Sequence, residues 1–259
     1  MFAGLAGWHL ALLGVILLVV IAIPVIAIVL IIRWTRRTSR GDTAASLVSA
    51  TLSISTAYAA LLLVGAIVNL TTTLLSPFVT LTVPVRPYWP MPLPGVEVQN
   101  GPTADILSGS ITHAELTLEG LSTGARLLWA GGQALYTLMP IAIAALIALV
   151  CFQLLRGAPF APAVARASAA TALVVLIGGS AAQIMSGVAG SMASREALDL
   201  TGWGMDGYPE EFDLHMVVPA STFDVPFDFW PIGAALGFIA LSAVFRYGTA
   251  LQRDTDLLV

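Results

Sequence analysis

Four side chains of the kinds that coordinate zinc and copper stand in two short segments that alternate between polar and apolar residues. They are His113 and Glu115 in the first segment and Asp213 and His215 in the second. Residues two apart on a strand share a face, so pairing of the two segments would bring two imidazoles and two carboxylates together. Such a set suits zinc or copper. The alternative, which we favour, is a solvated polar face that holds both histidines and no metal.

Sequence motifs that carry catalysis are absent from this chain. It has no phosphate-binding Walker loop, no Gly-x-Ser-x-Gly elbow, no His-Glu-x-x-His pair and no Cys-x-x-Cys. Its single cysteine, Cys151, lies in an apolar run and cannot form an intrachain disulfide. The sequence therefore predicts a protein that is not an enzyme and has no cofactor.

The elements that must position these side chains are membrane helices. Hydrophobic residues make up 58% of the chain and charged residues only 10%, against roughly 25% charged residues in soluble domains. Residues 8–32 carry no formal charge and are long enough to cross a hydrocarbon core of roughly 30 Å. A cleavable signal peptide is the alternative, but it needs a basic start and a shorter apolar run. We therefore expect an uncleaved first helix.

Arginines set the expected topology. Four of them follow the first apolar stretch directly, at Arg33, Arg36, Arg37 and Arg40. Basic residues beside a span stay in the cytoplasm, so the N-terminus is expected outside. Four more spans are predicted, at about 44–70, 127–155, 167–190 and 230–245. The predicted fold is an all-α transmembrane bundle of five spans with its C-terminus inside, in a bacterial plasma membrane.

The spans divide the chain into five segments. They are 1–70 with the first two spans, 71–126 outside, 127–190 with the next two spans, 191–229 outside, and 230–259 with the last span and a cytoplasmic tail. With these bounds, eight of the eleven basic residues lie on the inner side, as the positive-inside rule requires. The spans hold no charged residue, which disfavours an ion-driven carrier.

The two outer segments are predicted to contain strands. Six prolines between residues 77 and 94 exclude a long helix there. Residues 78–85 are rich in Val and Thr, and residues 111–119 alternate strictly. A similar alternation occurs at 211–218 in the second outer segment. We therefore expect one small extracytoplasmic sheet formed by both outer loops.

Small and hydroxyl-bearing residues predict close helix contacts on three spans, because they let helix backbones approach in lipid. The predicted packing residues are Ser46, Ser49, Ser53 and Thr56 on the second span, Gly179, Gln183, Gly187 and Gly190 on the fourth, and the pair Gly233 and Gly237 on the fifth. The alternative for the face of the second span is a polar pathway through the membrane, and a lipid-accessible cavity between the faces of the second and fourth spans would bind an apolar molecule. A small permease or transporter subunit is thus the second functional hypothesis.

Two stretches carry a resemblance to a known family. Residues 156–162, Arg-Gly-Ala-Pro-Phe-Ala-Pro, are followed closely by Arg166 and resemble the G-x-P-F inner loop of the bacterial membrane family catalogued as domain of unknown function 2975. Residues 247–259 resemble that family's C-terminal G-x-x-L-Q-x-x-x-D-L-x-V tail. The resemblance implies no enzymatic activity, and four spans rather than five. It also implies a regulatory setting, since such proteins are often encoded beside a small helix-turn-helix regulator.

Both matching stretches are expected on the cytoplasmic side. Together they predict a docking surface of Phe160, Leu251, Asp254, Asp256 and Leu257. Its expected partner is a cytoplasmic regulatory protein or another membrane subunit, while the outer sheet senses an envelope condition. The alternative is a tail that only caps the bundle, with its arginines reaching to the lipid surface. Direct nucleic-acid binding is not expected, and the oligomeric state stays open.

Overall fold

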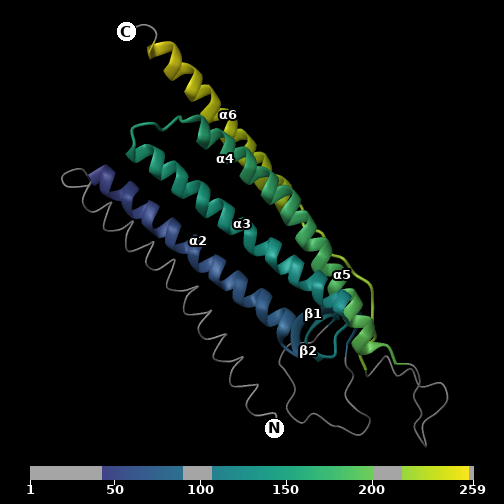
Figure 1. Ribbon diagram of the computed structural model, residues 1–259. Helices are drawn as coiled ribbons and strands as arrows, with labels where there is room; N and C mark the ends of the chain where they lie inside the picture. Colours follow the sequence, from purple (N-terminus) through teal and green to yellow (C-terminus); the bar gives the residue numbers. More distant parts are fainter. Residues whose placement is uncertain (1–42, 90–106, 201–217, 257–259) are drawn as a thin grey trace, which may run out of the picture. The chain divides into compact units, whose positions relative to one another are not determined.

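The computed structural model describes residues 43–89, 107–200 and 218–256 (Figure 1). The predicted first span at 8–32 lies outside these residues, and so do Asp213, His215 and Leu257. Within the described residues, four helices are long and apolar enough to cross a membrane. They cover the second to fifth predicted spans, and they indicate a multi-pass membrane protein.

The described part of the chain is mostly helical. Its elements, in chain order, are α2 (Thr43–Leu75), β1 (Phe78–Tyr88), β2 (Ile111–Glu119), α3 (Thr123–Leu155), α4 (Pro162–Leu173), the π-helical turn η1 (Val174–Gly178), α5 (Gly179–Leu198) and α6 (Trp230–Asp256). The fourth predicted span is therefore a composite of α4, η1 and α5. Pro140 lies inside α3. Membrane helices tolerate an internal proline.

The last helix corrects one prediction. We expected the fifth span to end near Phe245 and a tail to follow, but α6 continues as helix to Asp256. Charged residues end a membrane span because they leave the hydrocarbon, but they do not end a helix. Ala250, Leu251, Gln252 and Arg253 are all good helix formers. The predicted tail is thus largely a helical extension of the span.

The sheet bears on a second prediction, that both outer loops form it, and the described residues test that prediction only in part. Strands β1 and β2 pair antiparallel, from Phe78 opposite Glu119 to Pro84 opposite His113. Both strands come from the first outer segment, so the sheet does not need a strand from each loop. Among the described residues, the second outer segment contributes an isolated bridge from Ser221 to Val85. The predicted strand at 211–218 lies almost entirely outside the described residues.

The chain divides into two compact units, and the second contains the sheet. This unit comprises the described parts of Thr73–Gly131 and Gln183–Pro226. One face of β1 is buried, with Val79, Leu81, Val83 and Val85 each at most 3% exposed. Leu121, Ala125 and Ala193 complete this core. The buried face of β1 therefore packs against residues just before and at the start of α3 and against Ala193 of α5.

The first unit comprises the described parts of Met1–Thr72, Gly132–Ala182 and Phe227–Val259. Within it α4 and α6 lie side by side (Figure 1). The Ser242 hydroxyl of α6 donates to the Ala165 carbonyl of α4 at 2.8 Å, and this hydrogen bond is buried. Ser168 on α4 is also fully buried. Small side chains therefore bring these two helices close together.

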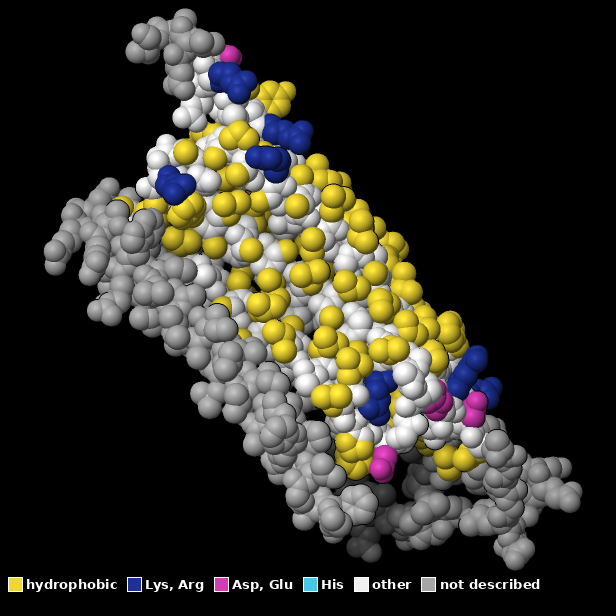
Figure 2. All heavy atoms as spheres, in the orientation of Figure 1, with side chains coloured by type: hydrophobic (Ala, Val, Ile, Leu, Met, Phe, Trp, Pro, Cys, Tyr) yellow, Lys and Arg dark blue, Asp and Glu magenta, His cyan; other side chains and the backbone are white. Residues whose placement is uncertain are grey.

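Apolar side chains are spread over much of the helical surface that Figure 2 shows. Leu61 on α2, Ile177 on η1 and Leu236 on α6 are each more than 60% exposed. Water would penalise so much exposed apolar surface, whereas a lipid bilayer accommodates it. The surface agrees with helices that lie in a membrane.

Candidate functional site

The loop between α3 and α4 is a defined turn. Gly157 has φ +71°, in the left-handed region that favours glycine at helix ends. The Gly157 and Ala158 amides donate to the carbonyls of Leu154 and Gln153, each at 3.0 Å, and so close the end of α3. Pro162 then begins α4, where its missing N–H costs no helical hydrogen bond. The G-x-P-F stretch is therefore held by its own backbone.

Phe160 of this loop packs against α6. Its ring lies 6.4 Å from the Phe245 ring, centroid to centroid. The Thr249 hydroxyl lies 2.5 Å from the Phe160 carbonyl and 2.8 Å from the Phe245 carbonyl, and it donates to either. Residue 248 must be glycine for this contact, because a Cβ there would overlap the Phe160 ring. The two stretches that carry the family resemblance therefore contact each other.

The predicted docking residues have different surroundings. Phe160 is 37% exposed because α6 covers part of its ring. Leu251 is 67% exposed and Asp254 is exposed. Asp256 is the last residue of α6, and Leu257 lies outside the described residues. Phe160 thus fixes the loop, whereas Leu251 and Asp254 are accessible.

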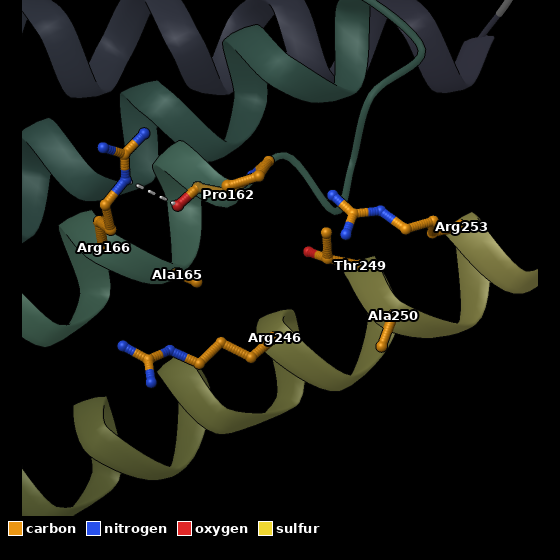
Figure 3. Close-up of a pocket in the computed structure, with 7 residues that line it drawn as sticks. All are labelled: Pro162, Ala165, Arg166, Arg246, Thr249, Ala250 and Arg253. Carbon is orange, nitrogen blue, oxygen red and sulfur yellow. Dashed lines mark hydrogen bonds between the residues drawn. The ribbon is translucent and has the colours of Figure 1, made fainter.

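A groove opens between α4 and α6 beside this contact (Figure 3). Its volume is about 310 Å³. The lining residues are Pro162, Ala165 and Arg166 of α4 and Arg246, Thr249, Ala250 and Arg253 of α6. Three of the seven are arginines and none is acidic, so the groove can hold an anion. We name it the arginine groove.

The arginines of this groove were not grouped by the sequence analysis. Arg246 and Arg253 are seven residues apart, so they share a face of a helix only where that helix includes both residues. Because the prediction ended that helix near Phe245, this signal was missed. Arg166 comes from another helix, and only the packing of α4 on α6 brings it to the same groove.

The serine face predicted on α2 is partly buried. Ser49 is 7% and Ser53 is 9% exposed, Thr56 is half-buried, and Ser46 is exposed. The Ser53 hydroxyl donates to the Ser49 carbonyl at 2.9 Å, and the Thr56 hydroxyl donates to the Leu52 carbonyl at 2.8 Å. These hydroxyls are satisfied within their own helix. The bonds give no support to a polar pathway along this face.

The packing residues predicted on α5 do lie at close contacts, but not all of them face helices. A Cβ added at Gly179 would lie 2.9 Å from the Pro231 side chain of α6. At Gly187 it would lie 2.9 Å from Val225, and at Gly190 it would lie 2.7 Å from the Thr82 carbonyl oxygen of β1. Gln183 is 5% exposed. This face of α5 therefore packs on a strand and an extended segment as well as on a helix.

The glycine pair predicted on α6 has a different environment. A Cβ added at Gly233 or Gly237 would meet no atom of the described chain within 4 Å. The close contact predicted for this pair is therefore not made within the described part of the chain. The GxxxG spacing showed that a partner helix can approach here, but not that one does.

The predicted metal residues are only partly described. His113 lies on β2, and its Nε2 atom is 3.8 Å from a carboxylate oxygen of Asp224. Glu115 lies opposite Thr82 in the sheet. Residues 43–89, 107–200 and 218–256 contain no group of three or more His, Cys, Asp or Glu side chains that could hold a metal. Asp224 was missed because it lies outside any alternating segment.

Comparison of the chain with protein-family models, curated proteins and solved structures finds no match. The function must therefore be argued from the residues themselves.

Proposed function

We propose that this chain is a non-enzymatic sensor or scaffold of the bacterial plasma membrane that couples an outer β-module to a cytoplasmic partner. The observation that carries the proposal is the helical extension of α6 beyond Arg246, which the loop at Phe160 holds in place. This extension carries the accessible side chains of Leu251 and Asp254. A helix fixed at its base is a better docking element than a free tail, because less conformational entropy is lost on binding.

Arginines support the proposed orientation. Arg156, Arg166, Arg246 and Arg253 all belong to the first unit, at the end of α3, the start of α4 and the end of α6. Figure 2 shows basic side chains, in dark blue, where α4 begins and α6 ends. The positive-inside rule supports a cytoplasmic location for this end of the α4–α6 pair, and we propose that the β-module lies outside. The resemblance to domain of unknown function 2975 adds a regulatory setting, with a cytoplasmic regulatory protein or another membrane subunit as the partner.

The β-module is the pair of strands β1 and β2. It is suited to sensing because it is a fixed, packed element. Its apolar residues form a core with residues of α3 and α5. Helix α5 continues through η1 into α4, so one continuous segment links the sheet-bearing unit to the α4–α6 pair. A π-helical turn such as η1 often marks a functional position in a helix. We expect a change at the sheet to pass along this segment.

Photo-crosslinking tests the docking half of the proposal. A photo-crosslinking amino acid replaces Leu251 in one variant and Leu236 in another, both on α6 and both more than 60% exposed. In native membranes, residue 251 is expected to crosslink to one discrete protein, and residue 236 to lipid only. Deletion of residues 251–259 should remove that protein from the co-purified set. Equal crosslinking at the two positions, or an unchanged co-purified set, contradicts the proposal.

The permease hypothesis receives less support. The arginine groove is lined by cationic side chains, which does not suit an apolar ligand. The hydroxyls of Ser53 and Thr56 bond to their own helix. We therefore retain the sensor or scaffold as the function that the described residues favour.

A further inference from the structure

Contacts within the protein hold both walls of the arginine groove. The buried hydrogen bond from Ser242 to the Ala165 carbonyl joins the two helices beside the groove. On the other side, Phe160 packs over Gly248, and the Thr249 hydroxyl is engaged with backbone carbonyls. Thr249 therefore has no proton left for a ligand. The side-chain donors that remain for a ligand are therefore the guanidinium groups.

The positive charge of the groove is not neutralised within the described chain. Arg166 donates from its Nε to the Pro162 carbonyl at 3.4 Å, a bond to a neutral acceptor (Figure 3). The ion pair between His113 and Asp224 lies in the other unit, and none of the residues that line the groove is acidic. Each guanidinium carries five N–H donors in a planar fork that matches phosphate oxygens. An anion in the groove would offer these donors charged acceptors in place of water.

The position of the groove favours a lipid headgroup as the source of that anion. It lies where two membrane-capable helices end, close to the predicted limits of their apolar stretches at Ala167 and Phe245. Tyr247, on the α6 turn beside it, is 75% exposed, and tyrosine is typical of the membrane interface. About 310 Å³ is at the lower end of ligand-site volumes, enough for a headgroup but not for a whole lipid.

We propose that Arg166, Arg246 and Arg253 bind the phosphate of an anionic phospholipid headgroup in this groove. Basic pockets between transmembrane helices are a known mode of headgroup recognition. The headgroup phosphate joins α4 to the extension of α6, so a bound lipid stabilises the α4–α6 pair. Free inorganic phosphate offers the same oxyanion chemistry from another source. Neither source depends on protein docking at Leu251, so this site and the proposed function are tested separately.

The test measures thermal unfolding of the full chain purified in a neutral detergent. Phosphatidylglycerol, phosphatidylcholine with the same acyl chains, and inorganic phosphate are titrated in separate series. Phosphatidylglycerol is expected to raise the unfolding temperature in a saturable manner, because a ligand that binds only the folded state stabilises it. Phosphatidylcholine, which carries no net charge, should raise it far less at the same concentration.

Matched arginine variants locate the effect. The double variant R166Q and R246Q should weaken phosphatidylglycerol binding about tenfold or more, because two charge-assisted forks are lost. The control is R156Q: Arg156 belongs to the same unit and is exposed, but it stacks on the Phe152 ring, 4.4 Å from the centroid, and does not line the groove. This control should keep binding within about twofold of the native chain.

Three results would overturn the proposal. The first is native-like phosphatidylglycerol binding by the double variant, and the second is equal weakening by R156Q. The third is an inorganic phosphate response that equals the lipid response and depends on the same arginines, which assigns the groove to a free phosphate. All these substitutions are at exposed positions, so an unchanged size-exclusion profile suffices to show that the variants fold.

Discussion

The two units use polar groups in opposite ways. In the sheet-bearing unit, two serines of α5, Ser191 and Ser194, are buried and hydrogen-bonded to backbone, whereas the buried Ser186 hydroxyl has no hydrogen-bond partner in the described chain. The Ser191 hydroxyl donates to the Asp224 carbonyl at 2.9 Å, and the Ser194 hydroxyl donates to the Pro84 carbonyl at 2.6 Å. In the α4–α6 unit, the groove arginines are exposed, and none of the residues that line the groove is acidic. Satisfied polar groups hold a structure together, whereas unsatisfied charges at a surface are available to a ligand.

The contrast has an energetic basis. A buried hydroxyl must find an acceptor, since an unmade bond costs about 1–3 kcal/mol. Ser191 and Ser194 of α5 meet this requirement by bonding to the backbone of the segment near residue 224 and of β1. An exposed guanidinium can instead form its hydrogen bonds with water. It therefore needs no acceptor from the protein and remains available to a ligand. The sheet-bearing unit is therefore expected to respond strongly to small substitutions, and the groove weakly.

The largest effect is expected at Gly190. An added Cβ would lie 2.7 Å from the Thr82 carbonyl oxygen, which is backbone and cannot rotate away. We expect G190A to lower the free energy of unfolding by about 2–3 kcal/mol, as overpacking of a tight core does. Thermal unfolding in detergent measures it. The control is G65A, where an added Cβ meets nothing within 4 Å and helix propensity improves by up to about 1 kcal/mol. Similar losses in both variants would show that α5 is not tightly packed on β1.

The second effect concerns Ser194, which bonds twice. Its hydroxyl donates to Pro84 and also accepts from the Thr222 amide at 3.3 Å. We expect S194A to cost about 1–2 kcal/mol of unfolding free energy, because two backbone groups lose their partner. The control is T51A, since Thr51 is exposed and donates only to the Leu47 carbonyl within its own helix. If S194A loses no more unfolding free energy than T51A does, the two hydrogen bonds of Ser194 do not stabilise the packing of α5 on the sheet.

Features local in sequence were the predictable ones. Strand β2 was predicted at 111–119 and is observed at Ile111–Glu119, because strict alternation records burial on one face. The four described spans were located because length without charge is a local property. The sheet partner, the proximity of Asp224 to His113 and the arginine groove all join residues far apart in the chain. Periodicity carries no information on such pairings.

The contact between the two stretches that carry the family resemblance was predictable only in part. The sequence predicted both stretches on the cytoplasmic side of the membrane. A shared side makes a contact between them possible but does not predict it. It could not show that Phe160 would pack over Gly248 rather than face a partner, since a glycine in a helix has several explanations. Phe160 was assigned to docking, which stays a prediction, and its contacts with α6 also make it part of the fold.

The smallest effect is expected at Gly248. An added Cβ would overlap the ring of Phe160, but that ring is 37% exposed and lies on a loop, so it can move aside. We expect G248A to cost about 1 kcal/mol of unfolding free energy, less than G190A, where the obstacle is backbone. Adding F160A should remove the overlap, so the double variant is expected to be no less stable than F160A alone, a coupling that a double-mutant cycle measures. Additive losses would mean that the ring and residue 248 do not touch, and the α6 extension would lose the anchor on which docking depends.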